Sequence, residues 1–355
     1  MMQIHTSNRE DNVKAIEMHI HSFSLRFQFK YRTDFDVFSF IALAKAQGFT
    51  GVNISANGPG YRDLGGTTDA HFEKVKDALV ESDMRCEIDT SDTRLDNLLK
   101  MLDVAGKVNA ECLRVYTKYP PPLQSQITQT VEDLRGAIHT LERTGIKLVF
   151  ENHEDFQGEV IADILSQVNH PLVRALYDYG NSQMVGEEPL DALEAMAPFV
   201  STVHVKDHVV VVGPEHAWGN LWVQGVPMGQ GRLPIMEQTH RLYENGLRRF
   251  CFENVWGYAA PLKSHHVPQS HCFGIDQTSH FLNGSDLPKD QAIDLEWKAF
   301  EEAWGWYKTA LTQQQYRVAI PLSRQPKDWS SFLAAADKVE VPADFLSHSE
   351  RLTDV

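Results

Sequence analysis

Four side chains of types that bind divalent metals each follow an apolar stretch of this 355-residue chain. Glu151 ends the run Leu-Val-Phe-Glu, Asp178 ends Ala-Leu-Tyr-Asp, His204 follows Thr-Val, and Glu253 ends Phe-Cys-Phe-Glu. They are separated by 27, 26 and 49 residues, which fits one strand-and-helix unit, a second unit and one enlarged unit. We therefore expect the four side chains to meet around one cation.

Three carboxylates and one imidazole form an oxygen-rich ligand set. Such a set suits Mn²⁺, Mg²⁺ or Co²⁺ and leaves positions open for a substrate, unlike a closed thiolate zinc site. We expect one divalent metal, with Mn²⁺ as the first choice and Mg²⁺, Co²⁺ or Zn²⁺ as alternatives. A cation would also relieve the repulsion among neighbouring carboxylates. The competing interpretation is that each carboxylate is solvated or caps the helix that follows it.

Short β-rich runs alternate with segments of helical periodicity. Strands are predicted at residues 15–19, 51–55, 84–89, 112–116, 147–151, 174–178, 202–206 and 249–253. Helices are predicted at residues 37–47, 71–82, 95–108, 128–144, 161–168, 189–196, 235–245 and 294–311. Strands that alternate with helices imply a parallel sheet with right-handed crossovers. Eight such units without a nucleotide-binding glycine fingerprint favour an α/β fold of the (β/α)₈ TIM barrel type over an open sheet.

The predicted barrel spans residues 12–314 and exceeds the minimal fold in two places. Residues 256–293 form a long loop after the eighth strand, which we expect to overhang the catalytic face as a lid. Residues 315–355 form a C-terminal extension that wraps the barrel or meets a partner. In a TIM barrel the catalytic groups project from the carboxyl ends of the strands, which is where the four metal-competent residues stand.

Composition and charge exclude several classes of function. The formal net charge of -15 repels a polyanion, so we expect no nucleic-acid partner. The polar N-terminus carries no apolar stretch of the signal-peptide type, and no apolar run approaches the roughly 20 residues that cross a bilayer. The expectation is a cytoplasmic protein that does not contact membranes. A homo-oligomer is also expected.

The motifs together resemble the xylose isomerase-like superfamily of sugar isomerases, epimerases and dehydratases. The matching pieces are Glu151, the Asp178-x-x-Asn181 of strand six, the His204-x-Lys206-Asp207 of strand seven, the turn Gly229-Gln230-Gly231, and Glu253. The resemblance covers about residues 15–312 and is specific for the superfamily rather than for one reaction. It implies a metal bound by Glu151, Asp178, His204 and Glu253 that chelates a small carbohydrate.

The resemblance also implies a chemistry. Coordination of a sugar carbonyl stabilises an enediolate, so that a side-chain base can remove the neighbouring proton. In the epimerase branch the glutamates of strands five and eight act on opposite faces of the sugar, which makes Glu151 and Glu253 the first catalytic candidates. The expected function is a metal-dependent isomerase or epimerase acting on a keto-sugar.

Two departures from the ketose 3-epimerase pattern keep a second function open. Asn181 stands where that branch usually has histidine, and no arginine follows His204 within several residues. His153 lies one pleat beyond Glu151, where it is a candidate general base or a second-sphere hydrogen-bond partner. This arrangement resembles lyases that process 3-oxo-glycosides, including C-glycoside deglycosidases, by β-elimination. A small partner subunit would then be expected.

Several other residues are candidates for binding the sugar. Histidines at the end of strand one, aromatic residues near the strand ends, a lysine and an arginine could contact its hydroxyls or its C–H faces. Core packing, or charge balance in the case of the lysine, is the alternative role for each. The candidates are His19, His21, Arg114, Tyr116, Asn181, Lys206 and Trp256.

Two further functions are less favoured. A DNA-repair endonuclease of the same superfamily would require more histidine and carboxylate ligands and a basic rim, which the net charge and Asn181 argue against. A sensor domain without turnover would be expected to have lost its ligands, yet all four are present in this chain.

Overall fold

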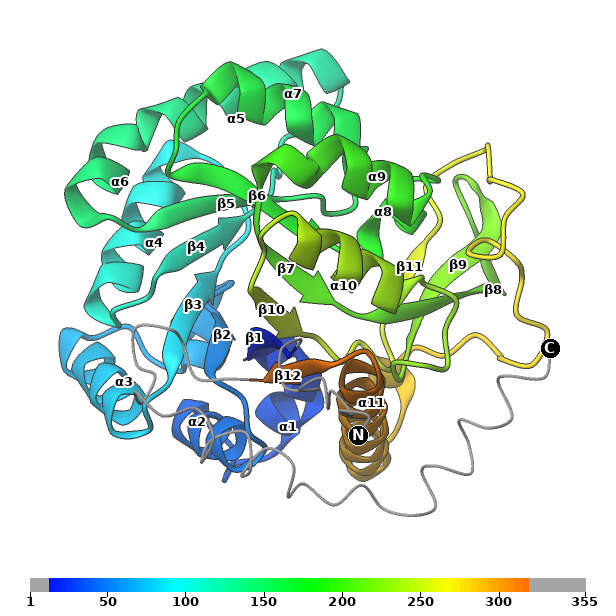
Figure 1. The fold of residues 1–355 in the computed structure, drawn as a ribbon, viewed down its shortest axis with the longest axis horizontal. Helices are drawn as coiled ribbons and strands as arrows, with labels where there is room; N and C mark the ends of the chain where they lie inside the picture. Colours follow the sequence, from blue (N-terminus) through cyan, green and yellow to red (C-terminus); the bar gives the residue numbers. More distant parts are fainter. Residues whose placement is uncertain (1–12, 319–355) are drawn as a thin grey trace, which may run out of the picture.

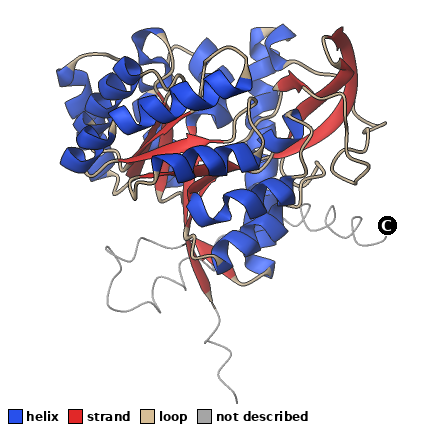
Figure 2. Cartoon of the chain, turned by 90° about the horizontal axis from the view of Figure 1, so that it is seen from above, coloured by secondary structure: helices blue, strands red, loops and turns tan. Residues whose placement is uncertain are grey.

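Residues 13–318, which the computed structural model describes, form a closed barrel of parallel strands surrounded by helices (Figures 1 and 2). Each barrel strand pairs with the next one in chain order, and the last pairs with the first. The barrel strands are β1 (Lys14–His21), β2 (Gly51–Ser55), β3 (Arg85–Asp89), β4 (Cys112–Val115), β5 (Lys147–Glu151), β6 (Val173–Asp178), β7 (Val200–Val205) and β10 (Arg249–Phe252). The prediction of an eight-stranded barrel is confirmed.

Helices cover the outside of the barrel and connect its strands. The predicted helix at 128–144 is divided in two, and the helix after β10 is longer than expected, with 25 residues. The α-helices are α1 (Arg26–Tyr31), α2 (Val37–Ala46), α3 (Asp69–Glu81), α4 (Leu95–Lys107), α5 (Leu123–Gly136), α6 (Ile138–Thr144), α7 (Gly158–Val168), α8 (Asn181–Met184), α9 (Pro189–Met196), α10 (Ile235–Glu244) and α11 (Lys289–Gln313). Short 3₁₀ turns are η1 (Ser22–Leu25), η2 (Pro59–Leu64), η3 (Ala197–Phe199) and η4 (Gly284–Asp286).

Local signals explain where several helices begin and end. The Asp36 side chain accepts the N–H of Ser39 at 2.9 Å and caps α2. At the other end of a helix, Gly145 follows α6 with a left-handed φ of 73°. Side chains that accept an early N–H, and glycines that adopt a positive φ, are the usual ends of helices.

The barrel strands are buried on both faces, which explains why their sequences are nearly continuous apolar runs. Burial of one large apolar side chain contributes about 1.5–3 kcal/mol, so this core holds the barrel closed. Each strand supplies fully buried residues to it, among them Met18, Val52, Ile88, Leu113, Leu148, Ala175, Val203 and Phe250.

A β-hairpin that is not predicted from the sequence lies between β7 and α10. Strands β8 (Asp207–His216) and β9 (Gly219–Val226) pair antiparallel, and β11 (Ala259–Pro261) adds to β9. The hairpin projects from one side of the barrel (Figures 1 and 2). It accounts for the long spacing of 49 residues between His204 and Glu253.

The segment 256–293 packs along this hairpin. β11 lies within the segment, and Ile275 forms an isolated bridge with Val210 of β8. Beyond α11, β12 (Tyr316–Val318) pairs with the start of β1. The rest of the predicted C-terminal extension, residues 319–355, lies outside the described residues, as do residues 1–12. None of the helices among residues 13–318 combines the length and apolarity needed to cross a membrane.

The turn Gly229-Gln230-Gly231 is held by the carboxylate of Asp207. That carboxylate accepts the N–H groups of Gly229 and Gly231 at 2.9 Å each and the N–H of Leu233 at 3.2 Å. A Cβ at Gly231 would lie 2.0 Å from Asp207 Oδ1 and 2.6 Å from the His208 carbonyl oxygen. The turn therefore requires glycine for space, and it fixes the chain immediately after Lys206.

We predict that Gly231→Ala lowers the free energy of unfolding by about 1–3 kcal/mol, because the added methyl group collides with backbone and carboxylate atoms. Denaturant unfolding followed by circular dichroism measures this change. Gly106→Ala is the matched control, since its Cβ would meet Ile146 Cδ1 at 3.8 Å and alanine favours the helix. Equal stability of both variants would contradict the prediction.

Candidate metal centre and active site

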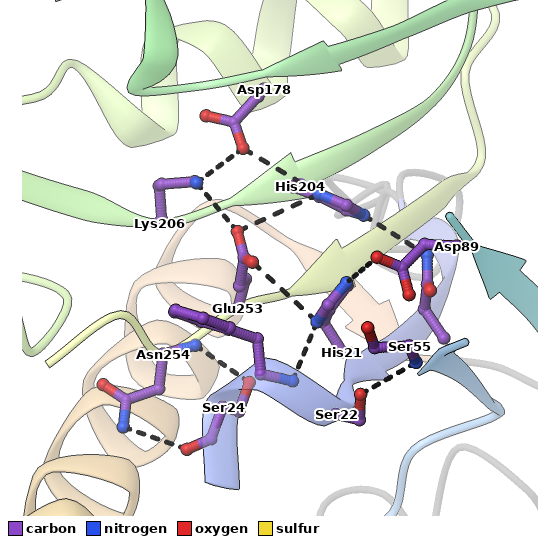
Figure 3. Close-up of polar contacts among 12 residues, drawn as sticks. His21, Ser22, Ser24, Ser55, Asp89, Asp178, His204, Lys206, Glu253 and Asn254 are labelled. Atoms are coloured by element: carbon purple, nitrogen blue, oxygen red, sulfur yellow. Dashed lines mark hydrogen bonds and ion pairs between the residues drawn. The ribbon is translucent and has the colours of Figure 1, made fainter. Parts of the chain in front are cut away.

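The four predicted metal ligands converge at the carboxyl end of the barrel, and Figure 3 shows three of them, Asp178, His204 and Glu253. His204 Nδ1 lies 3.4 Å from Glu151 Oε1, 3.9 Å from Asp178 Oδ2 and 3.9 Å from Glu253 Oε2. All four side chains are buried. Because β5, β6, β7 and β10 are consecutive in the barrel, their strand-end residues meet at one point.

The four predicted ligands, together with His21, form two overlapping groups rather than one. Ligand atoms of Glu151, Asp178 and His204 lie within 4.8 Å of one another, and so do those of His21, His204 and Glu253. His21, predicted as a sugar contact, therefore also stands at metal-ligand distance. His204 belongs to both groups and is the centre of the arrangement.

Asp178 is oriented by the backbone around it. Its Oδ1 accepts the N–H groups of Gly180 at 2.9 Å and Asn181 at 3.0 Å. The amide of Asn152 at the end of β5 accepts the Asp178 N–H at 2.7 Å. Oδ2 is left without a hydrogen-bond donor other than Lys206, so this oxygen is the one available to a cation.

The second nitrogen of His204 contacts a neighbouring strand. Asn53 Nδ2 of β2 lies 3.3 Å from His204 Nε2, and both side chains are buried. Groups that contact the far nitrogen of a metal-binding histidine fix its ring and its tautomer. Metal binding through Nδ1 requires the amide oxygen of Asn53 to face Nε2, which rotation of the amide by half a turn supplies.

Lys206 places a positive charge between two of the carboxylates. Its Nζ lies 2.8 Å from Asp178 Oδ2 and 2.9 Å from Glu253 Oε2, and Asn181 Oδ1 accepts from it at 3.3 Å. Burial opposes its charge, but the two carboxylates raise the pKa of Lys206 above its ordinary value. Lys206 therefore serves charge balance, the alternative role that the sequence leaves open.

Arg114 performs the same task on the other side of the site. Its guanidinium lies 3.0 Å from Glu151 Oε2 and 3.1 Å from Asp89 Oδ2. Asp89 ends β3 and is buried, and His21 Nε2 stands 3.7 Å from it. The sequence reading overlooks Asp89, although the rule that identified Glu151, a carboxylate at the end of an apolar strand, applies to it equally.

The charges in this cluster indicate that a divalent cation fits. Four buried carboxylates, those of Asp89, Glu151, Asp178 and Glu253, face two fixed cations, Arg114 and Lys206. Two negative charges remain without a fixed positive partner among residues 13–318. Burying unpaired charges is costly, and a divalent cation would neutralise this excess. The oxygen-rich donors match the hard cations predicted from the sequence.

A cavity of about 430 Å³ opens directly above the cluster. Its volume lies in the usual range of ligand pockets, about 300–1,000 Å³. It is lined by polar and aromatic side chains, as a sugar site requires. The lining includes His21, Arg114, Tyr116, Glu151, His153, Asn181, Lys206 and Glu253.

His153 lies in this cavity with its ring stacked on Tyr116. The two ring centroids are 3.7 Å apart and the planes differ by 8°. Burial lowers the pKa of His153 to about 4, although Glu151 opposes the shift. The imidazole is therefore neutral at pH 7 and can accept a proton.

Two predicted sugar contacts do not line the cavity. His19 lies deeper in the barrel, fully buried, with Nδ1 at 3.4 Å from Glu87 Oε1. Its ring fills the space above Gly51, where a Cβ would approach within 2.4 Å. The indole of Trp256 packs edge-on against Phe27 at 6.3 Å between ring centroids. Both contribute to packing, the alternative considered for each of them.

Other residues of the cavity wall are absent from the sequence prediction. Phe23 comes from the turn after β1, Arg62 from the loop after β2, and Tyr258 from the segment after β10. Phe23 and Tyr258 meet edge to face at 5.8 Å. They stand in loops, where no periodicity indicates which side chains turn inward.

A parallel barrel with an acidic, metal-competent cluster beneath a polar cavity defines a TIM barrel with its site at the carboxyl-terminal face. The chain belongs to the xylose isomerase-like TIM barrel family, whose sequence profile matches residues 40–264. The family expected from the motifs is confirmed.

Two curated relatives are similar at low identity. The uncharacterized protein YihM of Escherichia coli K12 is 24% identical over 218 residues, which is 61% of this chain and 65% of that protein. The 3-oxo-isoapionate decarboxylase of Pectobacterium atrosepticum is 22% identical over 182 residues, 51% of this chain and 65% of that protein. The match therefore spans just under two thirds of the length of each relative.

Solved structures share the fold. A D-psicose 3-epimerase of Clostridium cellulolyticum with D-tagatose superposes with a TM-score of 0.54 at 13% identity, over 81% of this chain and 98% of that one. A xylose isomerase-like TIM barrel protein of Mycobacterium smegmatis, in complex with magnesium, gives 0.51 at 14%, over 80% and 98%. The 3-keto-D-glucoside 4-epimerase YcjR of Escherichia coli gives 0.50 at 13%, over 72% and 96%.

We predict that Asn53→Ala lowers the affinity for Mn²⁺ by about 10- to 100-fold, because Asn53 orients the His204 ring without itself being a ligand. Calorimetric titration of metal-free protein with MnCl₂ measures the effect. Asn57→Ala is the matched control, since Asn57 contacts Asp89 and Ser55 but not His204. Unchanged Mn²⁺ binding by Asn53→Ala would refute this role.

Proposed function

We propose that this chain is a divalent-metal-dependent sugar isomerase or epimerase that removes a proton next to the carbonyl of a keto-sugar. The observation that carries the proposal is the pair of glutamates in the cavity. Glu151 ends β5 and Glu253 directly follows β10, so the two carboxylates enter from different walls of the barrel and face the same space. Such a pair can act on two sides of one substrate.

Neighbouring cations determine the charge of both glutamates. Burial alone would raise the pKa of Glu151, but the Arg114 guanidinium overrides it and the pKa falls to about 2. Burial is likewise overridden at Glu253, where Lys206 lowers the pKa below the ordinary glutamate value. Each carboxylate is therefore ionised at neutral pH and can accept a proton from a C–H bond.

The residues that would hold the metal are Glu151, Asp178, His204 and Glu253, with His21 at the edge of the group. A divalent cation there would polarise a substrate carbonyl and make the neighbouring C–H bond more acidic. The related structure with magnesium and the charge excess of the cluster support this assignment.

The chain's own residues then move the proton. One glutamate takes the proton from the carbon next to the carbonyl, which leaves an enediolate on the sugar. In an isomerisation the same carboxyl group returns the proton to the neighbouring carbon, while the hydroxyl proton passes from one substrate oxygen to the other. In an epimerisation the opposite glutamate takes up a proton from solvent and delivers it to the other face of the same carbon, and the first glutamate then releases its own proton to solvent. Throughout these steps Arg114 holds the carboxylate of Glu151 in place, and Lys206 holds that of Glu253.

We predict that the wild-type protein loaded with Mn²⁺ incorporates deuterium from D₂O into a ketohexose, and that Glu151→Gln and Glu253→Gln each lower kcat by about 10²–10⁴-fold. The amide keeps the size of each side chain but cannot act as a base. Nuclear magnetic resonance of the sugar C–H signals follows the exchange.

Glu132→Gln, on the exposed side of α5, serves as the control and should keep full activity. Treatment with a chelator should abolish exchange, and added Mn²⁺ should restore it. Exchange that persists after the chelator has removed all metal would overturn the proposal.

A second candidate function is a lyase or dehydratase acting on an oxo-sugar, including β-elimination from a 3-oxo-glycoside or a C-glycoside. The neutral His153 supports it, because a base at the edge of the cavity could take the proton whose loss expels a leaving group. The relative named as a decarboxylase of an oxo-sugar acid also shows that non-isomerising chemistry occurs in similar proteins.

We predict that His153→Gln separates the two functions. If the protein is a lyase with His153 as its base, the variant loses release of the aglycone from a 3-oxo-glucoside by about 10²–10⁴-fold. If it is an isomerase, aglycone release is absent in the wild type and deuterium exchange into ketohexoses survives the substitution. Chromatographic detection of the free aglycone distinguishes the cases.

The cellular location and the oligomeric state of the protein are further proposals. We propose a cytoplasmic location and a homo-oligomer, with a small partner subunit in place of the homo-oligomer if the chain is a deglycosidase. Size-exclusion chromatography with light scattering tests the oligomeric state.

A further inference from the structure

A second cavity, of about 550 Å³, lies beside the catalytic cavity. Phe23, Arg62 and Tyr258 line both cavities, so the two spaces share one wall. The rings of Phe23 and Tyr258 meet edge to face in this shared lining. The other side chains of the second cavity come mainly from α1 and its surroundings, namely Arg26, Phe27, Phe29, Lys30, Asp63, Ala259, Asn283 and Ser285.

Arg26 stands in the second cavity with no carboxylate of the described residues at ion-pair distance. Its guanidinium carbon lies 4.7 Å from the ring centre of Phe23, 4.6 Å from Phe27 and 5.7 Å from Tyr258. Its Nε is buried without a hydrogen-bond acceptor, and no carboxylate among residues 13–318 forms an ion pair with it. A buried donor left unpaired costs about 1–3 kcal/mol, and more when it is charged.

The carboxyl group that could compensate Arg26 is committed elsewhere. Glu296 of α11 accepts the backbone N–H groups of Phe27 and Gln28 at 2.9 and 3.0 Å. Burial raises the pKa of Glu296 to about 8, although its hydrogen bonds to the backbone and the charge of Arg26 oppose the shift. Burial lowers the pKa of Arg26 to about 10, which still leaves the guanidinium protonated. Because its Nε has no acceptor among the described residues, the guanidinium can still bind an anionic ligand.

The second cavity is positive in a protein that is otherwise acidic. Three cationic side chains line it, Arg26, Lys30 and Arg62, against the single carboxylate of Asp63. Asp63 accepts the hydroxyl of Ser22 at 2.7 Å, its Oδ1 lies 3.8 Å from Arg62 Nε, and its side chain is almost completely buried. The net charge of the whole chain is -15, so this concentration of cations departs from the rest of the molecule.

The backbone of Arg62 is strained where the two cavities meet. Arg62 has φ 38° and ψ -115°, and the preceding Tyr61 has φ 50°. Such conformations of non-glycine residues cost about 1–3 kcal/mol each and persist mainly where they position a functional group. The strain keeps a second guanidinium on the wall that both cavities share.

We propose that the second cavity is a subsite for an anionic group, a carboxylate or a phosphate, carried by the sugar whose reacting carbons lie in the catalytic cavity. A guanidinium donates two parallel hydrogen bonds to either anion, and the three surrounding rings pack against the guanidinium of Arg26. Only the placement of the reacting carbons rests on the proposed function. Binding of the anion by Arg26 does not depend on turnover.

Three matched ketohexoses test this subsite: D-fructose, D-fructose 6-phosphate and D-fructuronate. Calorimetric titration of the Mn²⁺-loaded protein should show at least one charged ketose binding about 10- to 100-fold more tightly than D-fructose. Arg26→Gln should remove this preference and leave the affinity for D-fructose unchanged. Which charged ketose binds better identifies the anion.

Arg32→Gln is the control, because Arg32 lies at the opposite end of α1, pairs with Asp34 and does not line the cavity. It should keep the preference for the charged ketose, and thermal melts of all variants establish that they are folded. Equal affinity for charged and neutral ketoses in the wild type, or a preference that survives in folded Arg26→Gln, overturns the subsite.

Failure of the subsite can be told apart from failure of the proposed function. Binding of a charged ketose through Arg26 without deuterium exchange into any sugar would retain the subsite and reject the isomerase. Deuterium exchange into D-fructose with no preference for charged ketoses would retain the isomerase and reject the subsite.

Discussion

Several carboxylates are buried at one end of this barrel, and their mutual repulsion is the constraint around which the site is organised. A carboxylate taken out of water costs several kcal/mol unless a positive charge accompanies it. The barrel supplies Arg114 from β4 and Lys206 from the end of β7, each placed between two carboxylates. The remaining negative charge makes the cluster a candidate site for a cation.

The same constraint gives the two glutamates pKa values that differ from the pKa of the neighbouring Asp178. The charges of Arg114 and Lys206 keep Glu151 and Glu253 ionised, whereas burial raises the pKa of Asp178 to about 6. Environments that push apart the pKa values of similar groups are typical of active sites. The geometry of the barrel thus gives three acidic side chains of similar type different protonation properties: two glutamates that stay ionised and one aspartate with a raised pKa.

The sequence predicts the barrel and the metal-binding cluster because both follow from periodic patterns. Apolar strands ending in Glu151, Asp178 and His204 place those side chains at one rim, whatever the loops do. The hairpin β8–β9 was not predicted, because its run of valines is equally compatible with a buried connecting segment. The cavity wall at Phe23 and Tyr258 could not be predicted, since loop conformations depend on tertiary contacts rather than on local spacing.

Lys206 has a further consequence for how the protein reaches its folded state. Many small metal-binding domains fold only when the ion arrives, because their ligands repel one another without it. Here a covalently attached ammonium group already bridges Asp178 and Glu253. The charges of these two carboxylates are therefore balanced within the chain, so folding of the barrel does not have to wait for an ion.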